Sequence, residues 1–322
     1  EFEPSSNELV SRIDELLQEQ GSPRERVALY QAALDRGVIA QRRRELLHKI
    51  GYIERNEIKN APGAIDAYRQ ALADDADDRE AHEALVELYQ ETKDWERLCD
   101  VLEERIGHAP VEEARKLRAQ LAEVAATHDQ KPRAAIHAAG LLADAGTGPA
   151  ELEVIERVAS ALDDVALATR VIERRISKAE DPREEVQWLE KLAALALDKK
   201  NDPASAVETL KRAAALALQL ADDDLARALF TRVRSIAPDD VEATAQLATL
   251  LEKAGQWSEL PALIELLLSK SELAEAKAAS WMRLARVQGD KLGNSAKGID
   301  AAENAFALTP EDPETLALLE RL

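Results

Sequence analysis

The chain has 322 residues, with 42 Lys and Arg against 62 Asp and Glu, so its formal net charge is −20. Hydrophobic residues make up 46% of the chain but aromatic residues only 3%, a composition that favours helix over strand. The acidic excess argues against nucleic acid as the main ligand, because phosphate binding needs clustered positive charge. The single cysteine, Cys99, excludes internal disulfides and cysteine-rich zinc sites.

The start of the chain bears on its origin and compartment. It begins at Glu1-Phe2, without an initiator methionine or the apolar core of a signal peptide, which indicates a fragment or a processed product. Whether Glu1-Phe2 is native stays open. Because a lone thiol is compatible with a reducing compartment, we expect a cytoplasmic protein, although an exported one is not excluded.

Residues 1–60 hold almost balanced charge, unlike the rest of the chain. They carry ten basic and eleven acidic residues, which leaves −19 of the net charge to the remaining 262 residues. The main basic concentration comprises Arg42, Arg43, Arg44, Lys49 and Arg55. It could meet an acidic segment, including one from a second copy of the chain, or form an ordinary solvated helix face.

Apolar residues recur with helical spacing along the whole sequence. Faces of this kind include Leu9, Ile13, Leu16 and Leu17, then Leu85, Leu88 and Tyr89, and later Leu247, Leu250 and Leu251. The breaks between them carry the helix-starting dipeptides Ser22-Pro23, Ala61-Pro62, Lys131-Pro132, Asp181-Pro182, Asp202-Pro203 and Asp312-Pro313. No segment has the pattern of a β-strand. The pattern predicts about eighteen helices joined by short turns, with neighbours antiparallel.

One spacing of small and aromatic residues occurs three times. The copies are Ala64-x3-Tyr68-x2-Ala71-x4-Ala76, Ala226-x3-Phe230-x2-Val233-x4-Pro238 and Gly298-x3-Ala302-x2-Ala305-x4-Pro310. This spacing resembles the second half of a tetratricopeptide repeat (TPR), and Leu85-x3-Tyr89 resembles the first half. Ala76 and Ala302 depart from the family pattern. The resemblance implies an all-α, TPR-like α-solenoid over residues 1–322, a right-handed superhelix of antiparallel helix pairs.

A row of acidic residues lies in the same segment as Leu85-x3-Tyr89. Glu80, Glu83, Glu87 and Glu91 share one helical face, with Gln90 alongside and Leu85 and Tyr89 on another face. In the TPR family, first-helix residues in this register line a concave groove that binds peptides or protein segments. The resemblance therefore implies a site for a basic partner segment, and the alternative is a solvated face that keeps the protein soluble.

The spacing of the repeats is irregular at residues 200–236. Trp95 and Trp257 begin matching segments 162 residues apart, which exceeds four units of 36 residues by 18. We predict helices at about 183–200, 203–220 and 223–236. These are three helices, whereas an array of helix pairs needs an even number. The surplus indicates an extra helix or a boundary between two stacks, and drift of repeat length is the alternative. The apolar segment 312–322 is expected to be a partial repeat or a cap.

The sequence offers no candidate for catalysis, for a metal or for a cofactor. His82-Glu83 starts like a zinc-protease helix, but Val86 stands where the second histidine belongs. His128, Asp129 and His137 match no ligand spacing, and Gly146-Thr147-Gly148-Pro149 lacks the lysine of a phosphate loop. The longest uncharged apolar stretch, 213–221, is far below the ~20 residues that span a bilayer.

The function expected from these features is a non-enzymatic scaffold that binds a partner peptide, helix or domain in the groove lined by first helices. The candidate contact residues are Glu80, Glu83, Glu87, Gln90, Glu91, Arg42, Arg43 and Arg44. Two alternatives remain: a regulatory or targeting domain of a larger protein whose enzymatic part is absent, and a self-assembling structural module. The partner is expected to be a protein, without nucleic acid or membrane insertion, and a homo-oligomer is compatible with the sequence.

Overall fold

The computed structural model describes residues 12, 15–16, 22–37 and 40–321. These residues form seventeen α-helices and two short π-helices, and none of them lies in a strand. The expected all-α, TPR-like array of antiparallel helix pairs is confirmed. Of the first predicted apolar face, only Leu16 lies within the described residues, and it is exposed.

The chain divides into two compact units, residues 1–168 and 169–322, which we call unit 1 and unit 2. The helices of unit 1 are α2 Pro23–Asp35, α3 Ala40–Ile53, η1 Glu54–Ile58, α4 Ala61–Asp74, α5 Arg79–Thr92, α6 Trp95–His108, α7 Val111–Thr127, α8 Lys131–Ala143 and α9 Pro149–Leu162. Helix α10, Val165–Lys178, crosses the division.

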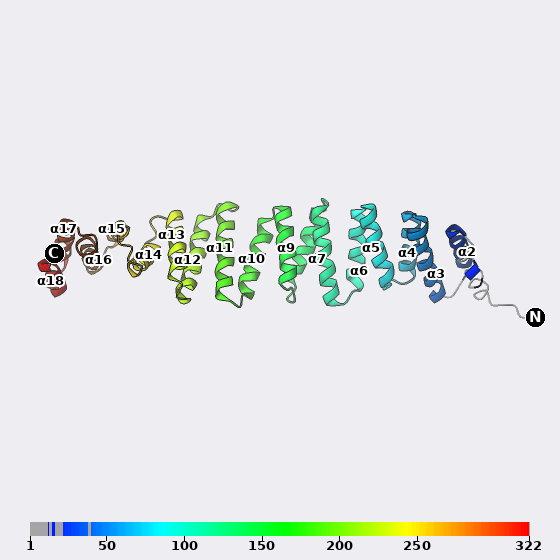
Figure 1. The fold of residues 1–322 in the computed structure, drawn as a ribbon, viewed down its shortest axis with the longest axis horizontal. Coiled ribbons are helices and arrows are strands. Elements are labelled where there is room, and N and C mark those ends of the chain that lie inside the picture. Colours follow the sequence, from blue (N-terminus) through cyan, green and yellow to red (C-terminus); the bar gives the residue numbers. More distant parts are fainter. Residues whose placement is uncertain (1–11, 13–14, 17–21, 38–39, 322) are drawn as a thin grey trace, which may run out of the picture. The chain divides into compact units, whose positions relative to one another are not determined.

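The helices of unit 2 are α11 Pro182–Asp198, α12 Pro203–Gln219, α13 Asp223–Ile236, α14 Val241–Lys253, α15 Leu260–Lys270, α16 Ala274–Arg286, η2 Val287–Lys291, α17 Ser295–Leu308 and α18 Pro313–Arg321. Within each unit, a helix packs mainly against its neighbours in sequence, and α7 also packs against α9. Figure 1 shows these helices as short rods joined by tight turns.

The predicted helix starts hold in the structure. Pro23, Pro182, Pro203 and Pro313 are first helical residues, a position where the missing N–H costs no intrahelical hydrogen bond. Aspartates directly before several helices cap them: Asp78 accepts from the Ala81 N–H (3.0 Å) and Asp240 from the Ala243 N–H (2.8 Å). Such caps satisfy backbone donors that a helix start would otherwise leave unpaired.

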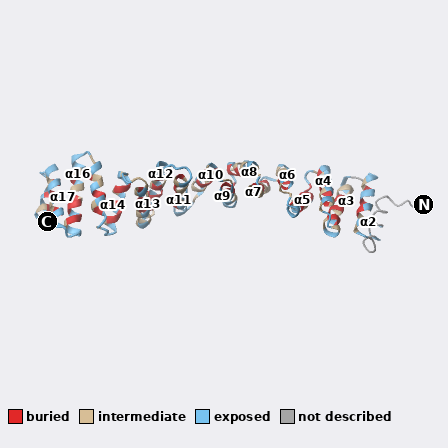
Figure 2. Ribbon diagram, turned by 90° about the horizontal axis from the view of Figure 1, so that it is seen from above, coloured by how far each residue is buried: buried red, intermediate tan, exposed pale blue. Residues whose placement is uncertain are grey.

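The motif residues lie where two helices of a pair touch. Ala64 and Ala71 are fully buried and Tyr68 is 5% exposed, and the copies in α13 and α17 are buried as well. A Cβ added to Gly51 on α3 would stand 2.6 Å from the Tyr68 ring, so the glycine makes room for the aromatic ring. Figure 2 shows buried residues along the helix faces that meet neighbouring helices.

From α3 onward, two kinds of turn connect the helices. In the first kind, one residue has a positive φ and the next N–H donates to a carbonyl five or six residues back, which closes the helix end. The positive-φ residues of these turns are Lys59, Lys93, Asp129, Asp163, Asn201, Ala221, Gly255 and Gly293. The second kind has no positive φ. The two kinds alternate except around α12, which has a turn of the first kind at both ends.

Candidate functional site

The predicted acidic row lies on α5, the first helix of a pair in unit 1. Glu80, Glu83, Glu87 and Glu91 keep 80%, 54%, 60% and 56% of their side chains exposed, and Gln90 is exposed too. Leu85, Leu88 and Tyr89 are buried on the other side of the helix. The same helical period that buries the apolar residues therefore presents the carboxylates to solvent.

Helix α3 and its π-helical extension η1 contact one side of this row through a histidine and one arginine. Arg55 donates to Glu87 (2.5 Å) and to Glu91 (2.6 Å). His48 Nδ1 lies 3.6 Å from Glu80 Oε1, while His48 Nε2 lies 2.6 Å from Asp78 Oδ2. One guanidinium thus serves two carboxylates, so the side of α5 that faces α3 keeps a negative excess.

Glu83 belongs to a different cluster, on the α6–α7 side of α5. It accepts from Arg79 (2.8 Å), and Arg105 of α6 lies 3.5 Å from it. The hydrogen bond from Arg79 holds the pKa of Glu83 below its usual value. The four glutamates therefore share a helix face but are divided between two sets of partners.

Tyr52 is a component of this region that sequence reasoning missed. It lies on α3, 59% exposed, one helical turn before Arg55, and its carbonyl accepts from the Asn56 side chain (3.0 Å). Its position on the polar face of a first helix was the available signal. We call Tyr52, Arg55, Glu80, Glu87 and Glu91 the α3–α5 surface.

The predicted basic residues of α3 are engaged within unit 1. Arg43 donates to Asp74 (2.6 Å) and Arg44 to Asp75, both at the end of α4. Arg42 donates to Glu45 on its own helix (2.9 Å). The structure therefore places Arg42, Arg43 and Arg44 beside acidic partners of the same unit. None of these partners is one of the α5 glutamates.

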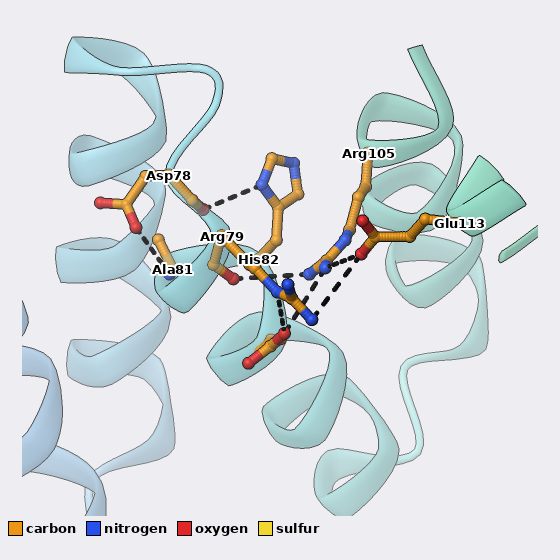
Figure 3. Close-up of polar contacts among 7 residues, drawn as sticks. Asp78, Arg79, Ala81, His82, Arg105 and Glu113 are labelled. Atoms are coloured by element: carbon orange, nitrogen blue, oxygen red, sulfur yellow. Dashed lines mark hydrogen bonds and ion pairs between the residues drawn. The ribbon is translucent and has the colours of Figure 1, made fainter. Parts of the chain in front are cut away.

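A hollow of about 230 Å³ lies between the α4–α5 turn and the α6–α7 turn. Its walls hold Ala76, Asp77, Arg79, His82, Arg105, His108, Ala109, Pro110 and Glu113. His82 is 3% exposed and Arg105 8% exposed, so two polar side chains are buried there. Figure 3 shows His82 on α5 with Asp78 on one side of its ring and Arg105 and Glu113 on the other.

Arg105 is held in this hollow by three contacts. Its guanidinium donates to Glu113 (2.5 Å), to Glu83 (3.5 Å) and to the Arg79 carbonyl (3.4 Å). These bonds join α5, α6 and α7. They also lower the pKa of Glu113, first through the hydrogen bond from Arg105. Sequence reasoning examined His82 only as a zinc-protease residue and missed this cluster, which draws on three helices and in which Glu83 and Arg105 are 22 residues apart.

No group of three or more histidine, cysteine or carboxylate side chains among the described residues is placed to hold a metal ion. Within the same part of the chain, every helix is too short or too polar to cross a membrane. Cys99 is fully buried on α6, and burial raises the pKa of its thiol. A buried thiol with a raised pKa is a poor nucleophile.

Comparisons with known proteins find matches among solved structures. MamA from Desulfovibrio magneticus RS-1 is 25% identical over 48% of this chain and 82% of its own, with a TM-score of 0.33. A tetratricopeptide repeat protein from Parabacteroides merdae is 12% identical over 87% and 98%, with a TM-score of 0.27. PilW, a type IV pilus biogenesis factor, is 13% identical over 88% and 99%, with a TM-score of 0.31.

No protein-family model and no curated protein matches the chain. With all three TM-scores below 0.5, the solved structures support no statement about this chain's partners. The repeat architecture rests on the chain's own helix pairs, caps and turns.

Proposed function

We propose that the chain is a non-enzymatic scaffold that binds a protein partner, and that the α3–α5 surface contacts a basic segment of that partner. The observation that carries this proposal is a row of largely exposed glutamates on α5, of which Glu87 and Glu91 share Arg55, while exposed Tyr52 lies one helical turn before Arg55. Exposed carboxylates attract Lys and Arg side chains, and an aromatic side chain adds contact area and a face for a cation.

The binding mechanism follows from the rigidity of the helix pairs. Because α3 and α5 are fixed by buried residues on their other faces, their exposed side chains are positioned before the partner arrives. Each exposed charge pair contributes about 0.2–1 kcal/mol, so several carboxylates must act together for useful affinity. Lys and Arg side chains of the partner would compete with Arg55 for the carboxylates of Glu87 and Glu91.

Glu83, Gln90 and the Arg42–Arg44 segment enter the proposal in secondary roles. Glu83 and Gln90 are exposed on α5, where Glu83 extends the acidic region and Gln90 adds an uncharged polar side chain. Arg42, Arg43 and Arg44 each have an intramolecular acidic partner, so an acidic partner segment would have to displace Glu45, Asp74 or Asp75. We place the scaffold in the cytoplasm on the strength of its single, unpaired cysteine.

A defined peptide tests the acidic surface. The probe is a fluorescent peptide of about twelve residues with alternating lysines, and its binding is measured by fluorescence anisotropy at several salt concentrations. The quadruple variant Glu80→Gln, Glu83→Gln, Glu87→Gln, Glu91→Gln is expected to bind about tenfold or more weakly, because four exposed charges act at a few tenths of a kcal/mol or more each.

The matched control removes four carboxylates elsewhere in unit 1. Asp66→Asn, Glu96→Gln, Glu104→Gln and Asp129→Asn change the net charge equally, and all four positions lie on second helices or in the α7–α8 turn, outside the acidic row. Equal weakening of both variants would show that net charge alone attracts the peptide. It would remove the acidic site and leave the scaffold without an assigned surface.

A further inference from the structure

His82, which lines the hollow between the α4–α5 and α6–α7 turns, carries a buried hydrogen-bond acceptor. His82 Nδ1 lies 3.1 Å from the Asp78 carbonyl oxygen, and because a carbonyl only accepts, the proton of the neutral ring is on Nδ1. The other ring nitrogen, Nε2, therefore carries a lone pair. No described residue offers it a hydrogen-bond donor, although it is shielded from bulk solvent. A buried acceptor without a donor costs free energy, so a group that supplies one is stabilised there.

The groups beside His82 Nε2 disfavour a charged occupant at this nitrogen. An anion would meet the Nε2 lone pair, which repels it. A cation would meet the guanidinium of Arg105, which stands beside the ring and is buried with it. The same guanidinium, after desolvation of the ring, helps to lower the pKa of His82. The formal charges of the lining groups balance, since Asp77 and Glu113 oppose Arg79 and Arg105.

The remaining walls are apolar and turn-like. Ala76 comes from the α4–α5 turn, and Ala109 and Pro110 come from the α6–α7 turn. A neutral group that fits here has an apolar body and one donor at its tip. A phenol meets both requirements, and its oxygen can also accept from Arg79 or His108 at the rim, which an indole N–H cannot do. The volume of about 230 Å³ accommodates one side chain.

We propose that this hollow is an anchor pocket for a tyrosine side chain of the protein partner, whose phenol O–H donates to His82 Nε2 while its ring packs on Ala76, Ala109 and Pro110. The proposal deepens the proposed function, because it rests on the chain being a partner-binding scaffold. It adds a neutral, directional contact to the charged contacts of the α3–α5 surface. A hydroxyl that pairs with a buried acceptor discriminates strongly against an analogue that lacks it.

Uncharged amino-acid amides test the pocket on the full chain. The probes are N-acetyl-L-tyrosinamide and N-acetyl-L-phenylalaninamide, titrated into protein labelled with ¹⁵N-histidine. The measurement is the ¹⁵N chemical shift of His82 Nε2, assigned by its loss in His82→Phe. We expect saturable movement of this resonance with the tyrosine amide, and binding of the phenylalanine amide at least about tenfold weaker because it leaves the acceptor unpaired.

Two further arms keep the result interpretable. His137→Gln is the control variant, since His137 pairs with Glu103 (3.0 Å) on another part of unit 1, and it should bind the tyrosine amide like the wild type. N-acetyl-L-tryptophanamide tests the choice of phenol over indole. Loss of binding in His137→Gln, or tighter binding of the tryptophan amide, would contradict the assignment.

Three outcomes would overturn the pocket itself. These are no movement of the His82 Nε2 resonance up to the solubility limit, equal binding of the tyrosine and phenylalanine amides, and a resonance already at a hydrogen-bonded position that neither amide moves. The last result would mean that a water molecule already donates a hydrogen bond to His82 Nε2. Because the probes are uncharged, failure here leaves the basic-peptide experiment on the α3–α5 surface unaffected.

Discussion

At the scale of single residues, the polar interactions described above lie where neighbouring helix pairs touch. Asp78 illustrates this: its side chain caps α5 and pairs with His48 of α3, and its carbonyl accepts from His82. Arg105 similarly joins three helices. A change at either residue would therefore disturb two helix pairs at once, although each residue looks like an ordinary surface charge in the sequence.

His82 gives stability a dependence on pH. Burial of the ring, with the nearby charges of Arg105 and His108, lowers its pKa below the ordinary value of 6.5, against the opposing effect of the Asp78 hydrogen bond and of Glu104. The unfolded chain therefore binds a proton at His82 at a pH where the folded chain does not. The free energy of unfolding is expected to fall as pH drops below 6.5.

Urea unfolding of the wild type and of His82→Phe checks this between pH 7.5 and pH 5. The wild type should lose stability relative to the variant as pH falls, because only the wild type has this proton to bind. Glu83 and Glu113 have lowered pKa values, so their protonation reduces the free energy of unfolding only below their ordinary pKa of 4.5. Their effect therefore lies outside the pH range in which His82 acts. Parallel pH profiles of the two proteins would contradict a depressed pKa for His82.

At the scale of helices and turns, prolines and aspartate caps predicted most boundaries. The expected helices at about 183–200, 203–220 and 223–236 correspond to α11, α12 and α13, which span Pro182–Asp198, Pro203–Gln219 and Asp223–Ile236. The positive-φ turns were harder to predict, because most are occupied by Lys, Asp, Asn or Ala rather than glycine. Tertiary packing holds those residues in a conformation that their side chains disfavour.

The turns give a physical basis for the irregular repeat. Positive-φ residues lie 34 to 38 residues apart from Lys59 to Gly293, except Asn201 and Ala221, which are 20 apart. We propose that α12, between these two turns, is the extra helix. Its buried small residues Ala206, Ala213, Ala214 and Ala217 allow close packing against both α11 and α13. The division between unit 1 and unit 2 lies elsewhere, inside α10.

Ala221 provides a test of backbone strain at this turn. It has φ of 55°, where an L side chain is disfavoured by about 1–2 kcal/mol and glycine is not. Ala221→Gly is expected to raise the free energy of unfolding by about 0.5–1 kcal/mol, after the greater entropy of unfolded glycine is counted. Thermal and urea unfolding measure the change.

Ala254 is the matched control for that substitution. It is also an exposed alanine at a helix end, but its φ is −77°. Ala254→Gly should lower stability, by up to about 1 kcal/mol, because only the entropy cost remains. If both substitutions destabilised the protein, Ala221 would not be strained, and the left-handed turn after α12 would lose its support.

The acidic site illustrates what sequence could and could not predict about function. The period of α5 predicted that its glutamates share an exposed face, which they do. Their partners could not be predicted from α5 alone, because the stacking of helix pairs decides which residues of α3 and α6 meet them. Arg55 lies 32 residues before Glu87, close to one repeat length, so a search for opposite charges at that spacing would have found the pair.

At the scale of the whole chain, ion pairs about one repeat apart recur in both units. They include Arg26–Glu57, Arg43–Asp74, Arg69–Glu104, Arg157–Glu123, Lys270–Asp239 and Arg283–Glu252. Most basic residues in these pairs meet an acidic residue of the adjoining helix pair. Because acidic residues outnumber basic ones by 20, the surplus carboxylates stay available to solvent or to a basic partner.

The core is organised as a series of local contacts. In unit 2 it runs through α11 to α18, while a separate cluster around Val27, Tyr30 and Ile50 lies in unit 1. In such arrays, stability is a sum of repeat terms and nearest-neighbour interfaces. A large-to-small change in one unit should therefore weaken nearby helices and leave distant ones unchanged, unless the whole chain unfolds as one cooperative body.

Leu210→Ala in α12 tests this locality. Leu210 is fully buried, and removing its side chain should cost about 2–5 kcal/mol through lost burial and a residual cavity. Hydrogen exchange measured by mass spectrometry should then show faster exchange in α11–α13 and unchanged protection in α3–α6. The reciprocal variant Leu85→Ala, also fully buried, should accelerate exchange in α4–α6 and leave α12–α15 unchanged. Equal loss of protection in both units, from either substitution, would mean that the repeats unfold together and that binding at the α3–α5 surface is coupled to the stability of unit 2.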